Sequence, residues 1–282
     1  MRRLLILLLP VMVTAAPNLG LEPRPTADAY ILLVDDEVDG VDIPQYQTSY
    51  YEAALDGLGL DYNIWDHAEN GEPELDDLNP YDIVIWVTGN SCPYPASNPE
   101  YGHSALSLNE EALLRTWLET PQARGLMLSG IWIAYNGVAD EVNDEQLPSV
   151  FFDYTMGLDY PGANFTDWIE VDSEWSLSGA GGELGLGDLG IEWVSVETYP
   201  DMLDSSLGNV EAYWTDPDGE DHHAAVISYE GSSFRTVFFA CPLESIDGTT
   251  NRRDVIDKVV SWFTAGEVGL VPTSWGQIKA LE

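Results

Sequence analysis

The chain has 282 residues, of which 45% are hydrophobic, and its 49 acidic against 10 basic residues give a formal net charge of −39. The apolar fraction is sufficient for a large core and argues against wholesale disorder. A surface this acidic repels nucleic acid and anionic lipid, because phosphate binding needs clustered Lys and Arg, so we expect no nucleic-acid partner.

The chain begins with the layout of a secretory signal peptide (residues 1–16), in which Arg2-Arg3 precede an apolar run over 4–13 and then small residues. Cleavage after Ala15 fits the rule that small residues flank the cut. The apolar run is too short to cross a bilayer, and no later segment approaches the ~20 apolar residues of a membrane helix. Residues 17–28 are interpreted as a disordered leader. We therefore expect bacterial-type export to a secreted or extracytoplasmic place, without membrane insertion.

The rest of the chain alternates predicted strands and helices, the pattern of an α/β domain. Short runs at 30–34, 62–65, 83–88, 126–129 and 236–240 predict a parallel sheet, most of them apolar throughout and so buried on both faces. Helices are predicted over 51–58, from a capping box of Ser107 and Glu110 to Pro121, over 144–156 and over 251–263, with a single helical turn within 75–81.

Residues 157–230 differ in character, with β-type segments separated by Gly and Asp turns. The predicted strands there are 165–171, 191–196, 210–215 and 224–229, and Asp218-Gly219 favours a hairpin between the last two. We interpret this region as a β-rich antiparallel insertion in a single domain of residues 29–266, followed by a tail of residues 267–282.

The acidic excess favours adaptation to a salty exterior, where ions screen the self-repulsion of the surface. Divalent-cation binding is the alternative. Asp35, Glu37, Asp39 and Gly40 follow the opening of a calcium loop, in which alternate side chains point inward. The twelfth position is Tyr46 and not the bidentate Glu. The sequence therefore predicts Ca²⁺ at these carboxylates only as an alternative to turn capping and solvation.

Two cysteines in an exported chain can pair, and Cys92 and Cys241 each follow a predicted strand. A Cys92–Cys241 disulfide is therefore predicted. The carboxyl ends of parallel strands are where such sheets bind ligands. The residues predicted to line a cleft there are Asp36, Asn90, Tyr94, Tyr101 and Ser129. Trp65, Trp86, Trp117 and Trp262 lie within strand or helix stripes and are predicted core residues.

Five segments carry a resemblance to a known superfamily: ILLVDDE at 31–37, YEAALDGLGLDYNIWD at 51–66, LDDLNPYDIVIWVTGN at 75–90, LMLSGIWI at 126–133 and FRTVFFACPLESI at 234–246. In this order they resemble the class I glutamine amidotransferase-like superfamily, and most of all its exported members that are not amidotransferases. The resemblance covers most of the chain after the leader. It implies a three-layer flavodoxin-like α/β fold.

Amidotransferases of that superfamily carry a cysteine at a sharp strand-to-helix turn and a His-Pro-Glu after the last strand. The chemistry needs both, because a neighbouring imidazole, itself oriented by a carboxylate, must generate the thiolate. In this sequence Trp132 stands at the nucleophile position, and Cys241 lies near the histidine position, with one extra residue before Glu244 compared with His-Pro-Glu. The resemblance therefore implies a degenerate site without glutaminase activity.

Two rebuilt sites stay open as alternatives. The hairpin can bring His222 and His223 back towards Cys241 and Glu244, or Cys92 can pair with a histidine of its own loop, His103. We expect an exported, non-catalytic binding or accessory domain for an extracellular protein or glycan. The alternative is an extracellular hydrolase of peptides or glycans, acting at the carboxyl edge of the sheet near Asp35.

Overall fold

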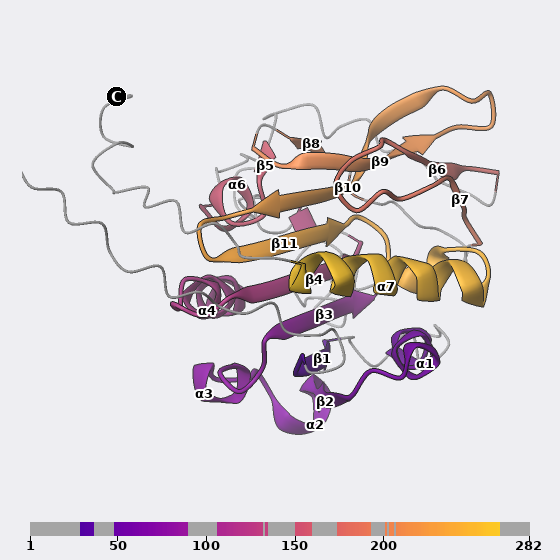
Figure 1. Cartoon of the computed structure of the whole chain (residues 1–282). Coiled ribbons are helices and arrows are strands. Elements are labelled where there is room, and N and C mark those ends of the chain that lie inside the picture. The colour runs from indigo at the N-terminus through magenta and orange to yellow at the C-terminus, as the bar shows by residue number, and fades with distance from the viewer. Residues whose placement is uncertain are drawn as a thin grey trace, which may run out of the picture.

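The computed structural model describes residues 29–36, 48–89, 106–131, 133–134, 150–159, 174–192, 201, 203–205 and 207–265. Within them, nine strands form one mixed sheet in the order β2-β1-β3-β4-β11-β10-β9-β6-β7. Figure 1 shows this sheet crossing the molecule from β2 at one end to β9, β6 and β7 at the other. The general α/β class predicted from the sequence is confirmed.

The first five strands in this order run parallel. They are β1 (Ile31–Asp35), β2 (Tyr62–Asp66), β3 (Ile83–Gly89), β4 (Arg124–Gly130) and β11 (Phe234–Phe239). β3 and β4 are buried along their whole length, as their apolar runs predict for strands covered on both faces. β2 is the edge strand and is only partly buried. Leu33 at the centre of β1 is in register with Ile64 on β2 and Ile85 on β3.

Antiparallel strands continue the sheet beyond β11. They are β10 (Asp221–Glu230), β9 (Asn209–Thr215), β6 (Ser176–Gly179) and β7 (Leu189–Gly190), while β5 (Leu158–Asp159) and β8 (Asp204–Ser205) form a separate pair. The predicted hairpin is present, because Gly219 N–H donates to Asp216 O at 2.9 Å and Gly219 has a φ of 81°. The strand predicted over 165–171 lies outside the described residues.

The helices are α1 (Thr48–Leu58), α2 (His67–Asn70), α3 (Leu75–Leu78), α4 (Leu108–Leu118), α6 (Val150–Tyr154) and α7 (Thr249–Thr264). α1 packs beside α7, and α4 packs beside both α3 and α6. In Figure 1, α7 runs along the sheet, where it contacts β4. The capping box predicted for Ser107 and Glu110 is present at the start of α4. No described helix is long and apolar enough to span a bilayer.

Three of the four tryptophans predicted as core residues are buried: Trp86, Trp117 and Trp262. Trp117 also donates its indole N–H to Leu78 O at 3.0 Å, which ties α4 to α3. Trp65 is only partly buried because it lies on the edge strand β2. Its indole instead donates to Gly71 O at 2.9 Å.

The chain changes direction across the sheet between β1 and β3. From β1 it passes through α1 to β2 on one side, and then returns to β3 on the other side of β1. Such a switch point leaves a crevice outside the carboxyl ends of the two strands, where open α/β sheets bind their ligands. The residues that follow β1, β2 and β3 are therefore the first place to look for a site.

Candidate functional site

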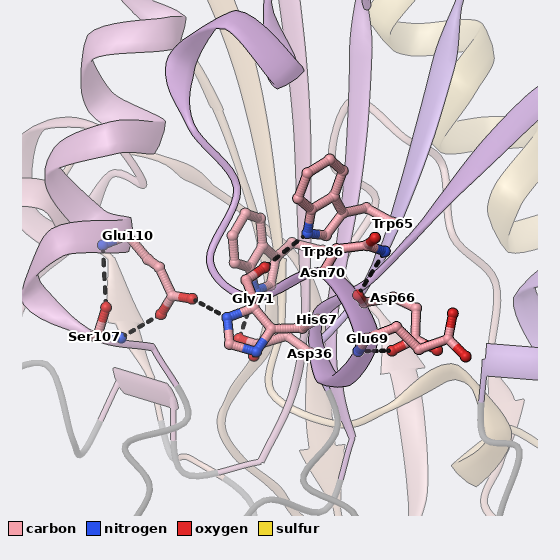
Figure 2. A network of polar contacts seen from close by, with 10 residues as sticks. All are labelled: Asp36, Trp65, Asp66, His67, Glu69, Asn70, Gly71, Trp86, Ser107 and Glu110. Atoms are coloured by element: carbon pink, nitrogen blue, oxygen red, sulfur yellow. Dashed lines mark hydrogen bonds and ion pairs between the residues drawn. The ribbon is translucent and has the colours of Figure 1, made fainter.

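Three ionisable side chains meet at the switch point. Asp36 follows β1 directly, His67 is the first residue of α2 directly after β2, and Glu110 lies in the first turn of α4, the helix after β3. Because β2, β1 and β3 are parallel neighbours, their carboxyl ends share one edge of the sheet. Figure 2 shows the His67 ring lying between the other two side chains. We call this group the Asp36–His67–Glu110 cluster.

The imidazole of His67 bridges the two carboxyl groups. Its Nδ1 lies 3.3 Å from Asp36 Oδ1, and its Nε2 lies 3.2 Å from Glu110 Oε1. The side chain of His67 is 28% exposed, whereas those of Asp36 and Glu110 are 10% and 5% exposed. Solvent therefore contacts the cluster mainly at the imidazole, whereas the two carboxyl groups are nearly buried.

Each carboxyl group has one oxygen held by a neighbour. Asp36 Oδ2 accepts a hydrogen bond from Trp86 Nε1 at 2.9 Å, and Glu110 Oε2 accepts from the backbone N–H of Ser107 at 2.7 Å. The Ser107 hydroxyl in turn accepts from Glu110 N–H at 3.2 Å, which completes the capping box. The second oxygen of each carboxyl group is thereby aimed at His67.

His67 is positioned by the short helix α2. Asp66 caps this helix by accepting from Glu69 N–H at 3.0 Å, and its backbone carbonyl accepts from the Asn70 side chain at 2.9 Å. At the other end Gly71, with a φ of 76°, donates to His67 O at 2.8 Å. A residue with a Cβ is strained at this φ, so glycine suits the turn that ends α2.

The contact between His67 and Glu110 has the distance of an ion pair but not the geometry of a hydrogen bond. Both His67 Nε2 and Glu110 Oε1 are buried atoms that have no hydrogen-bond partner among the described residues. The short distance alone contributes little, because hydrogen-bond strength falls steeply with poor angles. Buried polar atoms of this kind call for a further partner.

Burial, and after it the charge of the nearby Glu110 carboxylate, together raise the pKa of the Asp36 carboxyl to about 8, although the hydrogen bond from Trp86 opposes the rise. Two carboxyl groups around one imidazole repel each other unless a proton or a cation lies between them. Atoms from Asp36, His67 and Glu110 all lie within 4.8 Å of one another, which is compact enough to share one ion.

The thiol predicted in a disulfide is a free, fully buried side chain in the structure: Cys241 forms no disulfide. Its predicted partner Cys92 lies outside the described residues. Burial raises the pKa of the Cys241 thiol above its ordinary range, and the charge of Glu244 adds to the rise. A thiol that does not ionise and that solvent does not reach is a poor nucleophile.

Ser129, predicted to line the cleft, is instead buried in a chain of hydrogen bonds. Its hydroxyl donates to Cys241 O at 3.0 Å and lies 2.7 Å from the Tyr51 hydroxyl, which also accepts from Leu243 N–H at 2.9 Å. These bonds join α1, the end of β4 and the turn after β11. Ser129 therefore has a structural role.

The remaining rebuilt-site candidates are held by other partners. His222 Nε2 lies 3.0 Å from Asp216 Oδ2, and His223 Nδ1 lies 3.6 Å from Asp204 Oδ1, so both imidazoles pair within the β-rich region. Glu244 is buried in the turn after β11, and burial raises its pKa to about 8, although the Arg252 charge opposes the rise.

A backbone amide shortly after β4 is already bonded to a carboxyl group of the protein itself. Ala134 N–H donates to Asp201 Oδ2 at 3.0 Å, and both residues are buried. A backbone amide at a helix start is a natural anion site, and here a carboxyl group from the β-rich region takes it.

Several predicted site residues lie outside the described part of the chain. They are Glu37, Asp39, Asn90, Cys92, Tyr94, Tyr101, His103 and Trp132. The calcium loop, the degenerate nucleophile position and two cleft tyrosines therefore stay predictions. Asp35 is described and ends β1 beside Val87 of β3.

Sequence reasoning missed His67 altogether and interpreted Glu110 only as a helix cap. A usable signal was present, because Asp66-His67 follows the second predicted strand as directly as Asp35-Asp36 follows the first. Applying the strand-end rule to every strand in turn would have identified His67.

Comparison with known proteins identifies no family. No protein-family model matches the chain, and no curated protein matches it. A ThuA-like protein from Bacteroides uniformis has a similar structure, with a TM-score of 0.51 and 12% identity over 90% of this chain and 98% of that one. A cytoplasmic protein of Salmonella typhimurium also has a similar structure, with a TM-score of 0.51 and 12% identity over 83% of this chain and 98% of that one.

The β-galactosidase of Rahnella sp. R3 also has a similar structure, with a TM-score of 0.50 and 14% identity over 84% of this chain. This chain spans only 31% of the length of that enzyme. At such low identities a structural likeness reports the fold alone. These comparisons therefore support a general α/β fold.

Proposed function

We propose that this chain is an exported, non-catalytic binding or accessory domain. It has a three-layer flavodoxin-like fold and a degenerate amidotransferase-like site. Its binding site is the Asp36–His67–Glu110 cluster. The ligand is an extracellular protein or glycan, or an ion held by the cluster. The order of the five parallel strands, β2-β1-β3-β4-β11, supports this layering, because flavodoxin-like sheets have the order 2-1-3-4-5.

The position of the cluster is the observation that carries the binding assignment. It lies at the switch point of the sheet, where α/β folds bind ligands, and it brings together two of the described buried polar atoms that lack hydrogen-bond partners, His67 Nε2 and Glu110 Oε1. A separate hollow of about 330 Å³ lies between α1 and the start of α7 and is lined by Tyr50 and Arg252 among others, but by no residue of the cluster.

The state of the candidate nucleophiles supports the absence of catalysis. Nucleophilic catalysis needs an accessible group that a neighbouring base activates. Cys241 is buried with a raised pKa, and the Ser129 hydroxyl is bonded to Tyr51 and to a backbone carbonyl. The competing proposal is a hydrolase that acts on extracellular peptides or glycans through a rebuilt site at the carboxyl edge of the sheet, near Asp35, Cys92, Cys241 and Glu244.

Chemical labelling separates the two proposals. The Cys92→Ser variant, with Cys241 as its single thiol, is treated with iodoacetamide, and wild type is treated with a fluorophosphonate; adducts are located by mass spectrometry. We expect no adduct at Cys241 or Ser129 in the folded chain, and full alkylation of Cys241 in urea. Rapid labelling of either residue in the folded chain would refute the non-catalytic assignment and favour the hydrolase.

Export is tested separately. The full chain is produced in a bacterium with a working secretion system, and the N-terminus of the product outside the cytoplasm is sequenced. We expect cleavage after Ala15, where the small residues meet the rule for the signal-peptide cut. An uncleaved product retained in the cytoplasm would contradict this proposal without affecting the binding site.

A further inference from the structure

We propose that the Asp36–His67–Glu110 cluster binds one divalent transition-metal ion of the Zn²⁺ class, with one ring nitrogen and two carboxyl oxygens as its protein ligands. The inference rests on the proposed binding site and names its ligand. Figure 2 shows the two carboxyl groups and the imidazole facing one another at the carboxyl edge of the sheet.

The distances within the cluster suit such an ion. Zn²⁺ holds nitrogen and oxygen ligands at roughly 2.0–2.2 Å, so two ligands of a tetrahedral site lie about 3.4 Å apart. Asp36 Oδ1 and His67 Nδ1 are already 3.3 Å apart, and the ligand atoms of all three residues fall within 4.8 Å of one another. Because Asp36 and Glu110 contact different ring nitrogens, binding of one ion requires the imidazole or the Glu110 side chain to rotate.

The second observation is a buried polar atom that lacks a hydrogen bond. The Glu110 side chain is 5% exposed, and its Oε1 points into the cluster with no hydrogen-bond partner among the described residues, as does His67 Nε2. Leaving a buried polar atom unsatisfied is costly, and a bound ion is one of the recognised explanations. The ion supplies the missing partner for the carboxyl oxygen.

The surrounding bonds hold the ligands as a metal site requires. Trp86 holds the second oxygen of Asp36, and the Ser107 backbone holds the second oxygen of Glu110. Ligating carboxylates in metal sites are commonly hydrogen-bonded in this way by neighbours that fix their direction. Within the described part of the chain, His67 is the only basic side chain paired with either carboxyl group, so no Lys or Arg side chain competes with an ion for these oxygens there.

The donor set selects the class of ion. Imidazole nitrogen suits Zn²⁺ and other transition metals, whereas Ca²⁺ and Mg²⁺ take oxygen ligands. Three protein ligands on a tetrahedral ion leave one position open. That position takes water or a donor atom of the extracellular ligand, which connects the metal with the proposed binding function.

Zinc binding to the full chain, stripped of metal with a chelator, tests this inference. Competition with a chromophoric chelator gives the affinity and stoichiometry, and the visible spectrum of added Co²⁺ reports nitrogen ligation. We expect one Zn²⁺ per chain. We expect His67→Ala to weaken binding by at least about 100-fold, more than the 10–100-fold that losing an outer partner costs. The Co²⁺ spectrum should be lost as well.

Two matched controls and a second ligand variant make the result decisive. His222→Ala removes an exposed histidine, and Glu111→Gln changes the buried acidic residue next to Glu110; both should retain the wild-type affinity. Glu110→Gln keeps the capping box, because Gln serves at that position too, so it should fold and still lose affinity. Circular dichroism and melting temperature verify the fold of each variant.

Equal zinc affinity in wild type, His67→Ala and Glu110→Gln would overturn the inference, because it would place the ion elsewhere. Absence of stoichiometric binding to wild type would overturn it too, as would a preference for Ca²⁺ over Zn²⁺. None of these results alters the labelling of Cys241 and Ser129, so the metal test and the labelling test have separate outcomes.

Discussion

Glu244→Gln tests whether the buried carboxyl group of Glu244 makes the stability of the protein depend on pH. Glu244 is fully buried in the turn after β11, and burial raises its pKa from 4.5 to about 8. In the unfolded chain this carboxyl group loses its proton near pH 4.5, whereas in the folded chain it keeps the proton until about pH 8. The unfolded state binds fewer protons across that window, so stability falls as pH rises through it.

The size of the effect follows from the shift. One pKa unit corresponds to about 1.4 kcal/mol, so the rise to about 8 corresponds to roughly 5 kcal/mol between pH 4.5 and pH 8. That is a large part of the ~5–15 kcal/mol that stabilises a typical domain. Glutamine resembles the protonated carboxyl group and does not titrate. Glu244→Gln should therefore be close to wild type in stability at pH 5 and several kcal/mol more stable at pH 8.

Urea unfolding followed by circular dichroism, at pH 5, 6, 7 and 8 and constant salt, measures this difference. The pH dependence of the other acidic groups is common to both proteins and cancels when the two curves are subtracted, provided those groups do not interact with Glu244. Glu119→Gln, a change at a carboxyl group that is 61% exposed and pairs with Arg115, is the control and should run parallel to wild type. Parallel curves for wild type and Glu244→Gln would refute the assignment of a buried, protonated Glu244.

Three further changes test the packing around the site, each by urea unfolding. Tyr51→Phe removes one of the two hydrogen bonds of the Ser129 hydroxyl and the acceptor of the Leu243 amide, and should cost about 1–3 kcal/mol. Gly130→Ala places a Cβ on the Thr88 hydroxyl and should cost about 1–3 kcal/mol, whereas Gly187→Ala meets open space and should change stability by less than about 1 kcal/mol. Glu211→Ala removes a buried acceptor of three hydrogen bonds and should cost at least about 3 kcal/mol. A loss below about 0.5 kcal/mol for Tyr51→Phe or Glu211→Ala, or equal losses for the two glycine variants, would contradict these assignments.

The fold could be predicted from the sequence where local patterns are strong. The apolar runs of β1, β3 and β4 carry their own signal, because a strand buried on both faces needs apolar residues on both. The start of α4 was predictable from Ser107 and Glu110 alone, since a capping box is a contact between residues three apart. β6 and β7 were not predicted, because strands of four and two residues are too short to show periodicity.

The cluster could be predicted only in part, because its contacts depend on strand order. Asp36 was placed at the strand end correctly, but its neighbours come from segments far apart in sequence, and α2 is too short to give a helical pattern. Glu110 shows a further difficulty. Its Oε2 caps α4 while its Oε1 faces His67. Because the capping box alone accounts for a glutamate at this position, nothing in the sequence indicated the contact with His67.

The composition of the chain makes His67 the residue on which selectivity depends. With 49 acidic residues, the surface concentrates any divalent cation, and oxygen ligands alone hold hard cations such as Ca²⁺ without distinguishing one site from many. Nitrogen ligands are scarce, since the chain has four histidines. His222 and His223 pair with aspartates in the β-rich region, whereas His67 faces two buried carboxyl groups whose other oxygens are already bonded. A transition metal that prefers imidazole is therefore drawn to this cluster from an acidic surface that would otherwise hold cations everywhere.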